Sequence, residues 1–155
     1  MKHQLKLIEN TLILMLELES SIESQATDIR IDFYDRRLAV QNEQQSAFDL
    51  EARISNKSPK RVFSPLNISV RMLRGSLQIY WYTMNINRIT KKKHYNYIAK
   101  SKNGTYDLRT LKSKSSDAEW DLVKETEEKA AGLREQWKKL IQARSSLIRL
   151  RELSK

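Results

Sequence analysis

The sequence predicts an α+β protein with a long N-terminal coiled-coil-like helix, a three- to four-stranded antiparallel β-meander and a long C-terminal helix. Three observations predict it: heptad spacing of apolar residues at the start, apolar-polar alternation in the middle, and 3.6-residue periodicity at the end. We expect one domain with three segments, residues 1–56, 57–116 and 117–155.

The first helix is predicted from a 3,4 spacing between Leu5 and Ile54 that no glycine or proline interrupts. The spaced positions are Leu5, Ile8, Leu12, Met15, Glu19, Ile22, Ala26, Ile29, Phe33, Arg36, Val40, Glu43, Ala47, Leu50 and Ile54, and all but the three charged ones are apolar. At 1.5 Å per residue the helix would be about 75 Å long. Its apolar seam needs a partner, and we expect the C-terminal helix, a second copy or both, with a homodimer favoured.

The helix should end near Asn56, because Pro59 and Pro65 follow it. Alternation then predicts a strand over Leu66–Met72, a turn at Gly75-Ser76 and a second strand over Leu77–Ile86. Leu77, Ile79 and Trp81 share one face of that second strand, which we assign to the core. Tyr80 and Tyr82 share the other face.

A basic loop over Thr90–Lys93 leads to a third predicted strand over His94–Lys100. Asn103-Gly104 is a type I′ turn signal and predicts a fourth strand over Thr105–Leu108. The last helix should start at a capping box, Ser116 with Glu119, and run to about Leu153. Its apolar positions are Trp120, Val123, Ala130, Leu133, Trp137, Leu140 and Leu147.

The central segment is strongly basic and rich in aromatic residues. From Lys57 to Ser116 it holds fourteen Lys or Arg against the single acid Asp107, together with seven of the twelve aromatic residues of the chain. Clustered cations beside rings that can stack on bases are typical of nucleic-acid binding. The alternative interpretation is a solvated basic surface that keeps the protein soluble.

The candidate nucleic-acid-binding residues all lie in this segment. They are Arg71, Arg74, Tyr80, Tyr82, Arg88, Lys91, Lys92, Lys93, Tyr95, Tyr97, Lys100 and Lys102. Ordinary cross-strand packing of the tyrosines and a solvated lysine loop are the competing interpretations.

We predict no enzyme activity, no catalytic residue, no metal site and no cofactor. The chain has no cysteine, its two histidines (His3 and His94) are far apart, and it has no glycine-rich phosphate loop. A tyrosine nucleophile would need a base that the spacing does not supply. The apolar run Leu12–Leu16 is too short to cross a membrane, so we expect a soluble, cytoplasmic protein with no membrane partner.

The order of features resembles the MobI family of conjugative mobilisation proteins over roughly residues 66–150. The resemblance rests on a helical N-terminus, the aromatic triplet Tyr80–Tyr82 on a strand, a lysine-rich hairpin and a set of positions on the closing helix. The helix positions are Trp120, Glu125-Thr126-Glu127, Arg134, Leu140 and Arg144. The resemblance implies an auxiliary factor at the origin of transfer that helps a relaxase begin DNA processing, with no catalytic residue of its own.

Taken together, these features predict a non-catalytic protein that binds duplex or single-stranded DNA, with a relaxase or other transfer protein as partner. Two alternatives stay open. One is a helical scaffold or adaptor whose basic patch meets an acidic protein, and the other is an RNA-binding module with stacked tyrosines.

Overall fold

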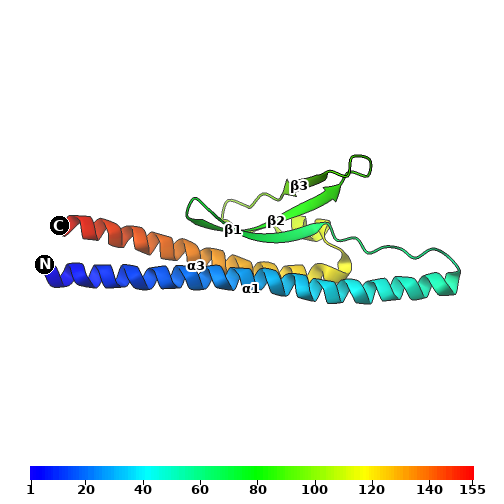
Figure 1. The fold of residues 1–155 in the computed structure, drawn as a ribbon, viewed down its shortest axis with the longest axis horizontal. Coiled ribbons are helices and arrows are strands. Elements are labelled where there is room, and N and C mark those ends of the chain that lie inside the picture. The colour runs from blue at the N-terminus through cyan, green and yellow to red at the C-terminus, as the bar shows by residue number, and fades with distance from the viewer.

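The computed structural model describes all residues from Met1 to Lys155 and has two layers, a pair of long helices and a small sheet on one side of it (Figure 1). Helix α1 spans Lys2–Ser55 and helix α3 spans Trp120–Leu153. The chain termini lie together at one end of the pair, beyond the sheet. The predicted α+β class, with its two long helices and meander, is confirmed.

The two helices pack antiparallel within one chain. Arg144 donates to Glu19 over 2.5 Å, and Arg36 donates to Glu125 over 2.6 Å. The start of α1 therefore lies beside the end of α3, and a later part of α1 lies beside the start of α3. Between these ion pairs, Ala26 and Phe33 of α1 are buried in the same apolar cluster as Ala130 and Leu133 of α3. Helix α3 therefore supplies a partner for the seam of α1.

The predicted heptad seam is correct only as far as Phe33. Beyond it the structure buries Arg37 and Ala52, whereas the predicted seam positions Leu50 and Ile54 are exposed. The reason is geometric, because an α-helix drifts by about 20° per heptad relative to a 3.5-residue repeat. The helix ends as predicted, with Asn56 in the left-handed conformation at φ 53°.

The sheet has three antiparallel strands in the order β1-β2-β3, spanning Leu66–Leu73, Ser76–Ile86 and Lys93–Tyr97. The predicted faces are confirmed: Ile68 and Trp81 are paired across β1 and β2 and both are buried. The Trp81 ring meets Phe33 of α1 edge to face, with centroids 5.3 Å apart. The sheet therefore rests on the helices through the face assigned to the core.

The first hairpin turn is formed by Arg74 and Gly75, not by Gly75 and Ser76. Both residues have positive φ, 50° and 74°, as a two-residue type I′ turn requires. Leu73 pairs directly with Ser76, so Ser76 already belongs to β2. The side chain of Arg74 is consequently displayed at the tip of the hairpin.

The predicted fourth strand is wrong. Asp107 instead caps a short helix, α2 (Leu108–Lys114), by accepting from the backbone N–H of Arg109 over 3.0 Å. Side chains satisfy the free edge of β2 where another strand would have paired: the Tyr106 hydroxyl accepts from Trp81 N–H, and Arg134 donates to the Ile79 carbonyl.

The Asn103-Gly104 turn is present but has a different geometry from the predicted one. Gly104 has a φ of 79°, whereas Asn103 has no positive φ, so the turn is not type I′. The N–H of Gly104 donates to the Ser101 carbonyl over 3.0 Å, and Ser101 Oγ donates to the Thr105 carbonyl over 2.9 Å. These bonds close a small polar loop that leads to Tyr106 and α2.

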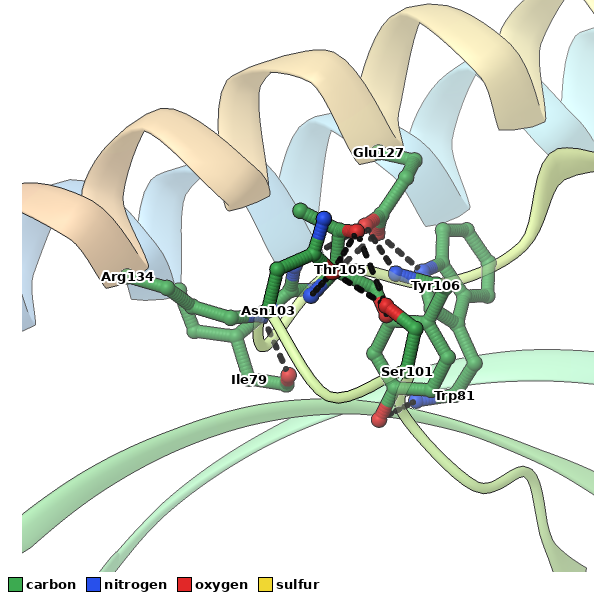
Figure 2. Close-up of polar contacts among 8 residues, drawn as sticks. All are labelled: Ile79, Trp81, Ser101, Asn103, Thr105, Tyr106, Glu127 and Arg134. Carbon is green, nitrogen blue, oxygen red and sulfur yellow. Dashed lines mark hydrogen bonds and ion pairs between the residues drawn. The ribbon is translucent and has the colours of Figure 1, made fainter.

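The loop and the sheet are held to α3 by the carboxylate of Glu127 (Figure 2). Glu127 accepts from the indole N–H of Trp81 over 2.7 Å and from both terminal nitrogens of Arg134, over 2.8 and 2.9 Å. The Arg134 guanidinium also lies 4.9 Å from the centre of the Tyr106 ring. A buried charge with this many partners is fully satisfied, so Glu127 fixes the position of the sheet on α3.

The predicted capping box is also wrong. Ser116 precedes a short 3₁₀ helix, η1 (Asp117–Glu119), without a side-chain capping bond, and α3 follows. Glu119 is buried and accepts instead from Arg37 Nε over 2.9 Å and from Ser64 Oγ over 2.7 Å. The same guanidinium donates to the side chain of Asn67 over 3.0 Å, so this network joins α1, the linker, β1 and η1.

Tyr34 of α1 protects the outer edge of β1. Its hydroxyl donates to the Ile68 carbonyl over 2.8 Å and accepts from the Ile68 N–H over 3.2 Å, which satisfies both backbone groups of that edge residue. Burial, with a smaller contribution from Tyr82, raises the pKa of Tyr34 to about 12. Helix α1 thus seals one edge of the sheet.

Candidate nucleic-acid interface

The sheet face that points away from the helices carries four tyrosines. Tyr80 and Tyr82 come from β2, and Tyr95 and Tyr97 come from β3. The strand register pairs Tyr82 with Tyr97 and Met84 with Tyr95, which places all four rings on one face. Neighbouring ring centroids are 5.6 to 6.3 Å apart, with planes tilted by 40–54°. We call this group the tyrosine platform.

The platform is open to solvent. Its four rings alone line a depression of about 140 Å³, and Tyr95 and Tyr97 are 50% and 63% exposed. Arg71 of β1 lies over the rings, with its guanidinium carbon 4.7 Å from the Tyr80 centroid and 5.9 Å from that of Tyr97. Rings and a delocalised cation are therefore displayed together on this face.

Two polar side chains of β1 on the same face, Asn67 and Ser69, are absent from the predicted site. They alternate with the buried residues of β1, as does the predicted residue Arg71, which the register sets opposite Gln78. Gln78 accepts from Arg71 Nε over 2.8 Å and so helps to hold that guanidinium over the rings. Strand alternation would have identified these residues, but the cross-strand register decides which of them lie beside the tyrosines.

The lysine hairpin between β2 and β3 is an ordered turn. Asn87 Oδ1 accepts from the N–H groups of Ile89 and Thr90 over 2.9 and 3.0 Å, and Lys91 has a positive φ of 58°. The Asn87 N–H donates to the Lys92 carbonyl over 2.9 Å and closes the loop. This geometry leaves Arg88, Lys91, Lys92 and Lys93 exposed together at one end of the sheet.

The remaining predicted cations lie elsewhere. Arg74 occupies the β1–β2 turn, at the opposite end of β2 from the lysine hairpin. Lys100 is 5.9 Å from the Tyr106 ring on the side of α3, where burial and then Arg134 lower its pKa. Lys102 is exposed in the loop after β3. The structure therefore gathers Arg71 with the tyrosines, places the lysine hairpin at one end of β2 and Arg74 at the other, and leaves Lys100 outside this face.

No group of three or more His, Asp or Glu side chains lies together in a way that could hold a metal ion. Asp107, the one acid of the basic segment, caps α2 and does not face the platform. None of the helices has a stretch with the length and hydropathy that a membrane span requires.

A family model described as MobI protein matches residues 22–148, most of the chain. The chain belongs to the MobI family. The match starts within α1 and includes the meander and nearly all of α3, so the earlier estimate of residues 66–150 was too short at its N-terminal side. No curated protein and no solved structure matches the chain.

Membership in the MobI family indicates a mobilisation-related accessory protein. The matched region contains the tyrosine platform, the lysine hairpin and the Glu127 and Glu119 networks. The first 21 residues, which form the free end of α1, lie outside the match.

Proposed function

We propose that this MobI-family chain is a non-catalytic DNA-binding factor that acts with a relaxase or another transfer protein in the cytoplasm. The observation that carries the proposal is the open sheet face, where Arg71 and the tyrosine platform lie between Arg74 at one end of β2 and the exposed cations of the lysine hairpin at the other. Phosphates would be held by the cations, and the rings would contact the nucleic acid between them. Family membership supports the connection with mobilisation.

The lysine hairpin gives the first prediction. Replacing Lys91, Lys92 and Lys93 together with alanine should weaken binding to all DNA sequences alike. The slope of log affinity against log salt should fall by up to about three, because each lost phosphate contact removes about 0.9 on duplex DNA. Fluorescence anisotropy over a salt series measures both quantities.

The matched control removes three exposed cations from the helices, Arg53 of α1 with Lys124 and Lys129 of α3, and so causes the same change in net charge. It should leave the salt slope nearly unchanged, because these residues lie on the helix layer and not on the sheet face. An unchanged slope in the hairpin variant, with intact circular dichroism, would move the site away from the hairpin. The competing cations are then Arg144, Arg149 and Arg151 near the end of α3.

The adaptor alternative differs from this proposal in its ligand. An acidic protein partner would use the same cations, but it would not give the chain a DNA affinity with a steep salt dependence. The same salt series therefore separates the two functions. RNA remains the third candidate, and matched RNA probes in that assay test it.

We also propose that the protein is a homodimer through the free end of its helix pair. We call this end the helix tip, residues 2–18 of α1 and 145–153 of α3, beyond the Glu19–Arg144 ion pair. The tip leaves many large apolar side chains exposed. They are Leu7, Ile13, Leu14, Leu16, Leu18, Ile148, Leu150 and Leu153. Leu14 and Leu18 are one helical turn apart and Leu7 lies two turns before Leu14, which forms a stripe that α3 does not cover.

Charge favours a second copy as the occupant of this surface. Between residues 7 and 29, α1 has five acids and no Lys or Arg, whereas between residues 138 and 151, α3 has five Lys or Arg and no acid. Two copies related by a twofold axis can set the acidic helix of each against the basic helix of the other. A four-helix arrangement would bury the leucine stripe.

If the protein is a homodimer, light scattering at micromolar concentration should give a molar mass twice that of one chain. Replacing Leu14 and Leu18 with glutamate should convert it to a monomer of unchanged helicity, because the charges would sit in the buried stripe. Leu50→Glu is the matched control, since Leu50 and Leu14 are both 59% exposed on the same helix. A monomeric wild-type protein would contradict the dimer and leave only the intramolecular helix pair.

A further inference from the structure

We infer that the tyrosine platform recognises unpaired bases, so that the DNA bound by this face is single-stranded. This inference rests on the proposed DNA-binding function and specifies its ligand. Phosphate contacts alone would not favour a single strand, because a duplex has the higher charge density along its axis. The distinction therefore depends on what the rings between the cations can contact.

The platform presents aromatic faces and edges rather than a protruding element. This face is made of strands alone, with no helix on it that could enter a major groove. The four rings line an open depression of about 140 Å³. In a duplex the base faces are stacked on one another, so the rings could not stack on them there. A single strand can splay its bases and lay them against the rings.

The ring geometry favours an added base over a closed cluster. The planes of neighbouring tyrosines are tilted by 40–54°, and Tyr95 and Tyr97 keep half or more of their surface exposed. Rings whose only role was cross-strand packing would bury most of their surface against their neighbours, whereas these two leave surface accessible to an added base. Arg71 adds a planar cation beside Tyr80 on which a second base can stack.

The cations are placed for a strand that runs along β2. Arg74 lies in the turn before this strand and Lys91–Lys93 lie in the turn after it, with the rings between them. β2 has 11 residues. At about 3.3 Å per residue its length is roughly 36 Å, which suits a short single-stranded site of about 4–16 nucleotides.

The test compares three probes of about 12 nucleotides, within the site sizes of such folds: an oligo-dT strand, a duplex, and an abasic strand with the same phosphates. The variant is Tyr95→Leu with Tyr97→Leu, which keeps charge and apolar packing but removes two exposed rings. The control is Tyr95→Phe with Tyr97→Phe, which keeps the rings. Affinity is measured by anisotropy, and circular dichroism checks the fold.

We expect the wild-type protein to prefer oligo-dT over both the duplex and the abasic strand. The leucine variant should lose about 5- to 150-fold in affinity for oligo-dT for each base that no longer stacks. Its affinity for the duplex and the abasic strand, and its salt slope, should stay close to wild type. The phenylalanine variant should bind all three probes nearly as the wild type does.

Three results would overturn the inference: equal wild-type affinity for oligo-dT and the abasic strand, tighter binding of the duplex, or a leucine variant that binds oligo-dT normally. If any of these occurs while the Lys91–Lys93 variant still loses affinity, DNA binding stands and only the single-strand assignment fails. If the wild type binds none of the probes, the proposed function fails as well. A fourth probe, an oligo-rU strand of the same length, is measured with the wild type, and tighter binding of it than of oligo-dT would assign the platform to RNA instead.

Discussion

Replacing Trp81 with alanine is expected to lower the free energy of unfolding by about 3–5 kcal/mol, the usual cost of removing a large aromatic side chain from a core. The ring has no exposed surface, packs edge to face on Phe33 of α1, and donates to Glu127 of α3. Its loss would leave a cavity where both helices meet the sheet and would remove one hydrogen bond from a buried carboxylate. Urea denaturation followed by far-ultraviolet circular dichroism measures the change.

Phe63→Ala is the matched control for this experiment. Phe63 is an aromatic residue in the linker before β1, and it is 69% exposed. Its truncation should change the free energy of unfolding by no more than about 0.5 kcal/mol, as surface substitutions usually do. A loss below about 1 kcal/mol in Trp81→Ala would contradict the assignment of this ring to the core.

Breaking the buried pair of Arg37 and Glu119 should destabilise the protein by a similar amount. Their side chains are only 6% and 1% exposed, so Glu119→Leu would leave the Arg37 guanidinium buried without its carboxylate. Removing one partner of such a pair costs about 3–5 kcal/mol, because the remaining charge stays uncompensated away from water. Arg37→Met should cost about as much for the same reason.

The double variant, Arg37→Met with Glu119→Leu, should recover most of that loss, because replacing a whole buried ion pair by apolar residues is often neutral. The recovery would be incomplete, since Arg37 also donates to Asn67 and to the Ser64 carbonyl. A double-mutant cycle in urea gives the coupling energy directly. Additive single losses would show that the two side chains stabilise the fold independently, contrary to this expectation.

The periodic elements were predictable from the sequence because their signals are local. Uninterrupted 3,4 spacing identified α1, and alternation identified β1 and β2 together with the burial of Trp81. The third strand was predicted over His94–Lys100, whereas β3 spans Lys93–Tyr97. The candidate site followed from the same logic, since alternation alone separates Tyr80 and Tyr82 from Trp81. That Tyr95 and Tyr97 lie on the same face as Tyr80 and Tyr82 depends on the register between β2 and β3.

The errors arose where a residue has a distant partner. Glu119 has the spacing of a capping box, but its carboxylate is used by Arg37 and Ser64, which are far away in the sequence. The segment after Gly104 looked like a strand until Tyr106 and Arg134 satisfied the edge of β2 and Asp107 started a helix. Local patterns cannot show which buried polar groups will meet.

The sequence by itself determined the class of this protein, the order of its elements, the concentration of positive charge in the meander and the resemblance to the MobI family. Those properties depend on periodicity, composition and motif order, which can be read along the chain. Only the tertiary structure decided which face of α1 is buried beyond Phe33, where the sheet rests, and that four tyrosines and Arg71 share one open surface. Those properties depend on contacts between residues that are distant in the sequence, and such contacts form only when the chain folds.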